Sequence, residues 1–201
     1  MLILLDNGHG GLIAGEYQTP GKRSPIWDDG SQLFEGEFNR AVVNGIIQQL
    51  TQHNIDYVVL TPELKDITLE TRVKRANRYY ETRRDCFFVS IHANAGGGSG
   101  CEIFTSPGAT KSDPIATIFG ETYQQLFPDQ RLRTDFSDND LDKERRFYVL
   151  TKTQMPAILT ENFFMDNETE CREFLMSATG RQRIIDYHVQ AIQKVQSTIY
   201  S

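Results

Sequence analysis

Residues 2–11 read LILLDNGHGG, and this stretch decides the fold. Its apolar first half is too short for a helix and is followed by turn-forming residues, so we predict a buried strand. Two later apolar runs are likewise followed by a polar side chain that can bind a metal or exchange a proton. Residues 86–91 lead directly into His92, and residues 157–160 lead directly into Glu161. We predict buried strands over both runs.

Helical and strand patterns alternate along the rest of the chain. Apolar side chains recur at helical spacing in residues 37–51, which predicts an amphipathic helix. The other predicted helices cover residues 68–81, 114–127, 167–176 and 178–198, and the other predicted strands cover residues 56–60, 102–105 and 147–150. Residues 10–33 and 128–145 are expected to be irregular. This alternation indicates one α/β domain over residues 1–201, with a largely parallel sheet.

Three side chains share a position in this scheme. His9, His92 and Glu161 each lie just past a predicted strand, and the carboxyl ends of parallel strands form one edge of a sheet, where ligands bind. A lone histidine after a strand is more often a hydrogen-bonded structural residue than a ligand. The glycines around His9, however, allow a ligand to approach the backbone closely. His53 and His188 lie on predicted helices and are interpreted as surface or packing residues.

Two histidines and a carboxylate form a ligand set suited to a catalytic zinc ion, with a fourth position left for water. The missing acid has two candidates in the sequence. Glu35 stands at the end of the long irregular segment, just before the first helix, and Glu37 follows within that helix. Position alone favours Glu35 but does not decide between them.

Composition excludes several classes of function. The formal net charge is −6, which does not support broad binding to nucleic acid or to an anionic membrane surface. The three cysteines, Cys86, Cys101 and Cys171, form no C-x-x-C pair and are expected to be free thiols, as in a reducing compartment. The N-terminus has no signal-peptide pattern, so the chain is either a full-length cytoplasmic product or one whose signal has been removed. We expect a monomer that does not insert into membranes.

Four motifs in order resemble the zinc N-acetylmuramoyl-L-alanine amidases, the type 3 amidase family of bacterial autolysins and phage endolysins. They are LDNGHGG at residues 5–11, EGEFN at 35–39, SIHANA at 90–95 and PAILTENFF at 156–164. The segments LETR at 69–72, AN at 76–77 and MDN at 165–167 are also similar to the family. The resemblance implies a mixed six-stranded sheet with helices on both sides. It also implies one Zn²⁺ held by His9, Glu35 and His92, with Glu161 as general acid and base.

The sequence departs from the family pattern at three places. Thr61-Pro62 replaces a common Thr-Arg pair, Phe163 replaces a common glycine two residues after the catalytic glutamate, and the loop from Leu12 to Leu33 is longer than expected. Trp27 in that loop has two interpretations, stacking on a sugar ring or fixing the loop.

The resemblance implies that the substrate is peptidoglycan and that the bond cut joins the lactyl group of N-acetylmuramic acid to L-alanine. Asp6 and Asn7 are expected to orient His9, since metal-binding imidazoles usually donate their other N–H. The alternatives are a zinc carboxypeptidase or deacetylase on a related fold, or a non-catalytic wall-binding module. We expect a protein made in the cytoplasm that acts on the wall, as an endolysin does, or a truncated secreted autolysin or cell-division amidase.

Overall fold

The computed structural model describes residues 1–137 and 139–201. A mixed sheet runs through its centre in the order β4-β1-β5-β8-β6-β7, and the β6–β8 pair is antiparallel while the other neighbours are parallel. The sheet strands are β1 (Leu2–Asn7), β4 (Asp56–Val59), β5 (Cys86–Asn94), β6 (Cys101–Thr105), β7 (Lys143–Glu144) and β8 (Ala157–Phe164). A separate small hairpin pairs β2 (Leu12–Ile13) with β3 (Glu16–Tyr17).

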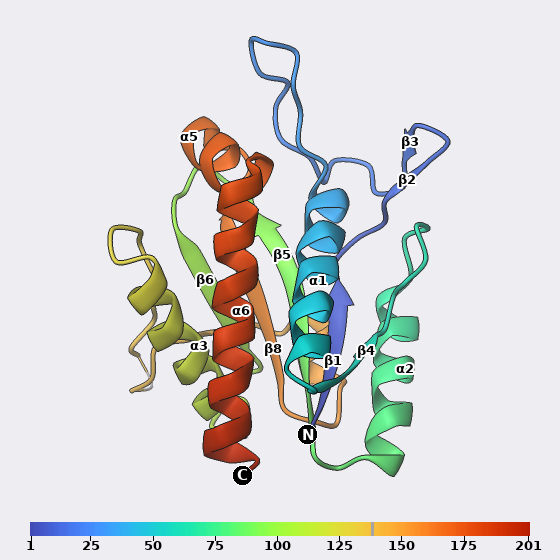
Figure 1. Ribbon diagram of the computed structural model, residues 1–201, viewed down its shortest axis with the longest axis vertical. Coiled ribbons are helices and arrows are strands. Elements are labelled where there is room, and N and C mark those ends of the chain that lie inside the picture. The colour runs from blue at the N-terminus through green and yellow to red at the C-terminus, as the bar shows by residue number, and fades with distance from the viewer. Residues whose placement is uncertain (138) are drawn as a thin grey trace.

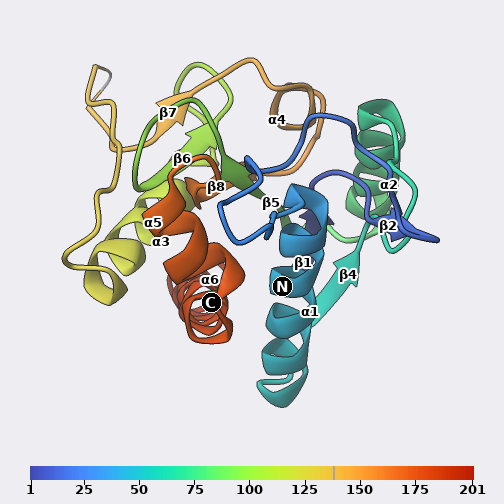
Figure 2. The same ribbon diagram turned by 90° about the horizontal axis from the view of Figure 1, so that it is seen from above.

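Helices cover both faces of the sheet (Figures 1 and 2). They are α1 (Glu35–Gln52), α2 (Leu69–Thr82), α3 (Asp113–Leu126), α4 (Tyr148–Thr151), α5 (Glu168–Glu170), a π-helical segment η1 (Cys171–Met176) and α6 (Ala178–Ile199). Side chains of α1, α3 and α6 pack on one face in the larger core, and those of α2 and α4 pack on the other. The predicted three-layer fold, with its mixed and mostly parallel sheet, is confirmed.

Strand β1 shows how the sequence produces this layering. All six of its residues are buried, because it lies between two neighbours and has helices on both sides. Ile3 and Leu5 belong to the core beneath α1 and α6, while Leu2 and Leu4 belong to the core beneath α2. A continuous apolar run is what a doubly covered parallel strand requires.

Three sequence predictions need correction. Residues 147–150, expected as a strand, instead form the short helix α4 at Tyr148–Thr151, since a four-residue apolar run has no periodicity that separates the two. The segment expected to be irregular over residues 10–33 contains the β2–β3 hairpin. The helix expected over 167–176 is a short α5 followed by η1.

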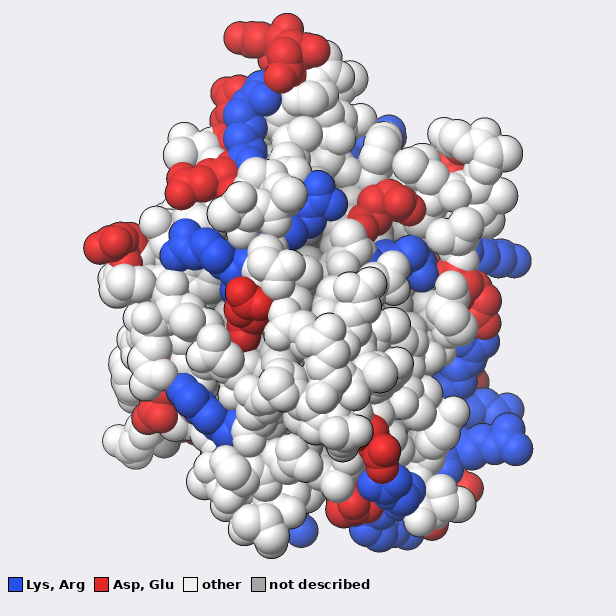
Figure 3. Space-filling view, in the orientation of Figure 1, with Lys and Arg blue, Asp and Glu red and all other residues white. Residues whose placement is uncertain are grey.

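The surface carries mixed charge. Figure 3 shows acidic and basic side chains interspersed on the face that it draws, separated by uncharged areas. Among the described residues, no helix is both long and apolar enough to cross a bilayer.

Candidate metal and catalytic site

Three side chains converge at the carboxyl edge of the sheet. His9 follows β1, His92 lies near the end of β5, and Glu35 is the first residue of α1. Nδ1 of His92 lies 3.0 Å from Oε1 of Glu35, and Nε2 of His9 lies 3.2 Å from the same oxygen. One imidazole nitrogen from each histidine and one carboxylate oxygen of Glu35 all lie within 4.8 Å of one another. Strand-end positions predicted that the two histidines meet, and the family resemblance implied Glu35. Both strands, however, run further than predicted: β5 continues beyond His92 and β8 beyond Glu161.

The structure separates the roles of the two glutamates at the start of α1. Glu35 is 1% exposed and faces both imidazoles. Glu37 instead accepts a hydrogen bond from the backbone N–H of Leu12 at 2.8 Å and so holds the loop. Burial raises the pKa of Glu35, but the adjacent imidazoles of His9 and His92 outweigh it, and the pKa lies well below its ordinary value.

Close backbone packing fixes the two histidines. His9 has a φ of 68°, in the left-handed region that non-glycine residues seldom occupy. The carbonyl of the preceding Gly8 accepts a hydrogen bond from Asn39 of α1 at 2.9 Å. A Cβ atom on Gly8 would lie only 2.1 Å from Cε1 of His92. Glycine is therefore needed at position 8 because the His92 ring occupies the space that any side chain would take.

Glu161 lies beside this cluster on the next strand. In the sheet, His92 of β5 is in register with Glu161 of β8. Oε2 of Glu161 is buried and accepts no hydrogen bond from the described residues. Burial, followed by the negative charge of Glu35, raises the pKa of Glu161 well above its usual value, and Lys22 opposes this. A carboxyl group that binds its proton more tightly than usual is suited to general acid and base chemistry.

The strand bends directly after Glu161. Asn162 donates from Nδ2 to the carbonyl of His92 at 2.9 Å, which ties the two strands together at an irregularity in their pairing. Phe163 has a φ of 59°, which explains why the family commonly has glycine at this position. Its ring is 1% exposed and stacks on Phe174 of η1 with centroids 4.1 Å apart. Aromatic packing therefore holds a backbone conformation that glycine would adopt freely.

Sequence reasoning missed a buried acid on the far side of Glu161. Glu102 of β6 is in register with Glu161, and its carboxylate is held by Arg133, Lys143 and Asn94 at 2.6–2.7 Å. Burial raises the pKa of Glu102, but Lys143 and Arg133 outweigh it and lower the pKa, so Glu102 is held as a carboxylate whose charge adds to the raised pKa of Glu161. Alternation along β6 and β8 could have placed the two acids on one face, but their register could not be read from the sequence.

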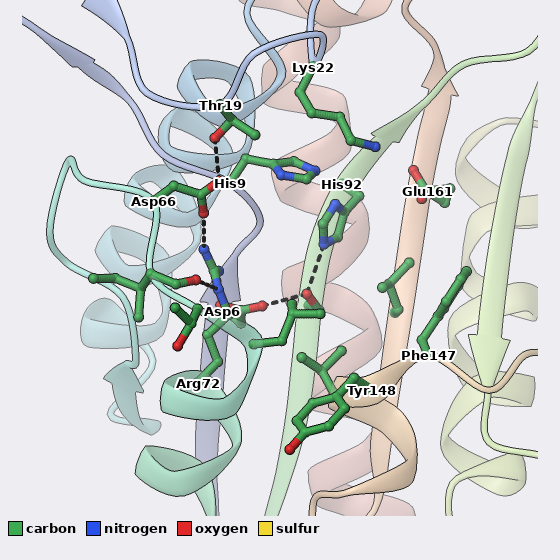
Figure 4. Close-up of a pocket in the computed structure, with 16 residues that line it drawn as sticks. Asp6, His9, Thr19, Lys22, Asp66, Arg72, His92, Phe147, Tyr148 and Glu161 are labelled. Atoms are coloured by element: carbon green, nitrogen blue, oxygen red, sulfur yellow. Dashed lines mark hydrogen bonds and ion pairs between the residues drawn. The ribbon is translucent and has the colours of Figure 1, made fainter.

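The cluster opens onto a groove of about 620 Å³. One wall is apolar and is formed by residues including Leu69 of α2, Phe147 before α4, Tyr148 of α4 and Leu159 of β8. Above them, Lys22 of the long loop points its ammonium group toward the space between His92 and Glu161 (Figure 4). The groove therefore joins an apolar surface to the titratable cluster.

Trp27 belongs to the loop and not to the groove. It packs against the main core, and the guanidinium of Arg172 lies 5.9 Å from its ring centroid. Arg172 also pairs with Asp29 at 2.9 Å. Of the two interpretations of Trp27, these contacts favour fixing the loop.

The expected orientation of His9 by Asp6 and Asn7 is wrong. Asp6 contacts Arg72, Ser90 and Thr61, and the side chain of Asn7 accepts from Thr61. The reason is geometric: Asp6 lies inside β1, where its side chain meets Ser90 of β5 and Arg72 of α2 and not His9. His188, as expected, is a packing residue, because it is fully buried and contacts Thr160 and the carbonyl of Ile184. Its burial lowers its pKa to about 4.

The cluster fits a metal ion by its own chemistry. Oε2 of Glu35 and Nε2 of His9 are buried and have no hydrogen-bond partner within the described residues. Two imidazole nitrogens and one carboxylate oxygen are ligands that zinc prefers, and three protein ligands are typical of catalytic sites. The fold and this cluster together define an α/β domain with a candidate metal-binding site at the carboxyl edge of its sheet.

The sequence matches the N-acetylmuramoyl-L-alanine amidase family over residues 3–194, and the chain belongs to that family. Among curated relatives, it is 30% identical to the N-acetylmuramoyl-L-alanine amidase CwlM of Bacillus licheniformis, over 88% of this chain and 61% of the relative. It is 29% identical to the endolysin of Bacillus phage SPP1, over 96% of this chain and 65% of that protein. The chain therefore spans about three fifths of the length of these relatives.

Solved structures have the same fold. The N-acetylmuramoyl-L-alanine amidase from Clostridium difficile 630 superimposes with a TM-score of 0.81 at 23% identity, covering 98% of this chain and 97% of that one. The amidase AmiC2 of Nostoc punctiforme gives a TM-score of 0.75 at 25% identity, with 98% and 97% covered. This agreement confirms the fold over almost the whole chain.

Proposed function

We propose that this protein hydrolyses the amide bond between the lactyl group of N-acetylmuramic acid and L-alanine in peptidoglycan. His9, Glu35 and His92 would hold one zinc ion, and Glu161 would act as general acid and base. The observation that carries the proposal is the carboxyl group of Glu161, one strand away from the His/Glu cluster, whose Oε2 is buried without a hydrogen-bond donor among the described residues and whose pKa is raised. Family membership supplies the substrate class.

Each residue has a separate part in the reaction. A zinc ion bound by these ligands would polarise the scissile carbonyl and lower the pKa of its water to about 7. Glu161 would accept the proton of the attacking water at Oε2 and then deliver it to the leaving amine nitrogen of L-alanine. The apolar wall at Phe147 and Tyr148 would contact the substrate on either side of the bond.

The decisive experiment digests purified sacculi and identifies the products by mass spectrometry, with and without a chelator. An amidase releases intact stem peptides with a free L-alanine amine. Release of a single C-terminal amino acid would instead support a carboxypeptidase, and release of acetate a deacetylase. Wall binding with no released product would support the non-catalytic module. Activity unaffected by complete metal removal would refute the metal mechanism.

Substitutions test the assignment of residues. Glu161→Gln is expected to retain zinc and lose activity by about 100-fold or more, the usual contribution of a general acid and base. Glu35→Gln is expected to lose zinc, while Glu37→Gln serves as a matched control because Glu37 holds Leu12 and not the cluster. Metal content is measured by elemental analysis. Zinc loss in Glu37→Gln with full retention in Glu35→Gln would reverse the assignment.

A further inference from the structure

A chain of buried polar groups leads from the far side of His92 into the sheet. Nδ1 of His92 faces Glu35, and the other ring nitrogen, Nε2, lies 3.1 Å from the hydroxyl of Ser90. Ser90 Oγ lies 2.6 Å from Oδ2 of Asp6, with which it is in register between β5 and β1. Ser90 and His92 lie two residues apart on one strand, so both project to the same face.

Asp6 ends this chain as a fully engaged carboxylate. It is 1% exposed, and its Oδ1 accepts from Arg72 at 2.5 Å and from the hydroxyl of Thr61 at 3.2 Å. Arg72 is 2% exposed, and its remaining donors reach Asp66 and the carbonyls of Asn7 and Ile67. A buried carboxylate with a buried guanidinium partner is tolerated as an ion pair, and here every Asp6 oxygen faces a donor.

The hydrogen bonds that link His92, Ser90 and Asp6 can be donated in only one direction. A carboxylate can only accept, so the Ser90 hydroxyl donates to Asp6. The Ser90 oxygen is then left to accept from Nε2 of His92. A neutral imidazole with its proton on Nε2 has its lone pair on Nδ1, which is the atom that faces Glu35 in the His/Glu cluster.

We propose that Asp6 and Ser90 act as positioning residues that hold His92 in the tautomer whose Nδ1 can bind a metal. Metal-binding histidines commonly donate directly to a carboxylate, and here a serine hydroxyl stands between the two. The inference rests on the metal site of the proposed function. It assigns the LETR motif a role, because Arg72 compensates the charge at the end of the chain.

Three variants separate positioning from mere packing. Ser90→Ala removes the acceptor for Nε2, and we expect zinc affinity to fall by about 10- to 100-fold, the usual effect of losing such a partner. Asp6→Asn keeps the shape of the side chain but reverses the direction of the hydrogen bonds between residues 6, 90 and 92. The amide nitrogen of the new side chain, facing Ser90, donates to the serine oxygen. The hydroxyl would then donate to Nε2 and place the proton on Nδ1, so this variant is expected to bind zinc at least as weakly.

Thr61→Val is the matched control. It removes a hydroxyl from the same carboxylate but has no hydrogen bond to His92 among those described. We expect its zinc affinity to stay within about threefold of the wild type, as for a partner that acts only on packing. The affinities are measured by competition with a chromophoric chelator, and the coordination by the visible spectrum of the Co²⁺-substituted proteins.

The outcomes distinguish this inference from the proposed function. If the wild type fails to bind zinc, the metal site itself is refuted. If the wild type binds but Ser90→Ala and Asp6→Asn bind equally well with unchanged Co²⁺ spectra, only the positioning role is refuted. Equal losses in all three variants would show that the carboxylate network acts through stability alone. Should Ser90→Ala not fold, the isosteric Asp6→Asn decides.

Discussion

Gly8→Ala tests the packing of the site without replacing any of the three proposed metal ligands, His9, Glu35 and His92. The added Cβ would lie 2.1 Å from Cε1 of His92 and 2.5 Å from both ring nitrogens, while ordinary contacts begin at 3.4 Å. Gly8 is not among the positive-φ glycines, so alanine brings no strain of its own to the backbone. The collision with the His92 ring is therefore the main effect of the substitution.

The magnitude follows from the geometry of metal binding. The ring must move by about 1.3 Å to restore contact distance. Metal–ligand distances are kept within about 0.2 Å, so a displacement of this size removes His92 from the ligand set. We expect the zinc affinity to fall by about 100-fold or more, equivalent to about 2.7 kcal/mol.

The assay measures the zinc dissociation constant by chelator competition and the melting temperature of the metal-free protein. Gly45→Ala is the control, because its Cβ would lie 2.3 Å from Cδ1 of Ile185 in a helix–helix contact away from the site. That variant should lose stability by about 1–3 kcal/mol through overpacking and keep its zinc affinity. Wild-type affinity in Gly8→Ala, or an equal loss in Gly45→Ala, would refute the reasoning.

Two further outcomes concern stability. Phe163→Gly should relieve about 1 kcal/mol of backbone strain but lose about 3–5 kcal/mol of buried aromatic packing, so a lower melting temperature is expected and a higher one would contradict the stacking argument. Burial of His188 lowers its pKa to about 4. In the unfolded chain the His188 imidazole has a pKa of about 6.5, so it takes up a proton at a higher pH than in the folded protein. The free energy of unfolding therefore falls as the pH drops from about 6.5 toward 4, by about 3 kcal/mol in all. Urea unfolding between pH 7 and 4.5 should show a steeper loss for the wild type than for His188→Gln; equal slopes would exclude His188 as the source.

The sequence allowed most of the sheet and the site to be predicted, for physical reasons. Strands β1, β5 and β8 are buried on both faces, so they contain continuous apolar runs, and the polar residues that follow these runs stand out. Glu35 lies on a helix and needed the family resemblance, since spacing alone did not exclude Glu37. The strand predicted over residues 147–150 was wrong, because a run of four apolar residues has no periodicity that separates a strand from a helix.

What could not be predicted depends on register between strands. Asp6 lies beside Ser90, and Glu102 beside Glu161, only because of how β1, β5, β6 and β8 pair. One signal was available: Ser90 and His92 stand two residues apart, so a strand that continued through His92 would place both side chains on one face. Asp6 contacts Ser90 on that face. The sequence led us to expect that it orients His9, because only its proximity to His9 in the sequence was known.

The stacked pair of Phe163 and Phe174 links the acid to a part of the protein that contributes nothing to the groove. Two residues after Glu161 in β8, the left-handed backbone conformation of Phe163 is held by an aromatic ring of η1, from outside the sheet. Substitutions in η1 are therefore expected to alter the strand that carries the proposed acid without lining the groove. An engineer who wishes to alter the rate while leaving substrate recognition intact would begin at Phe174.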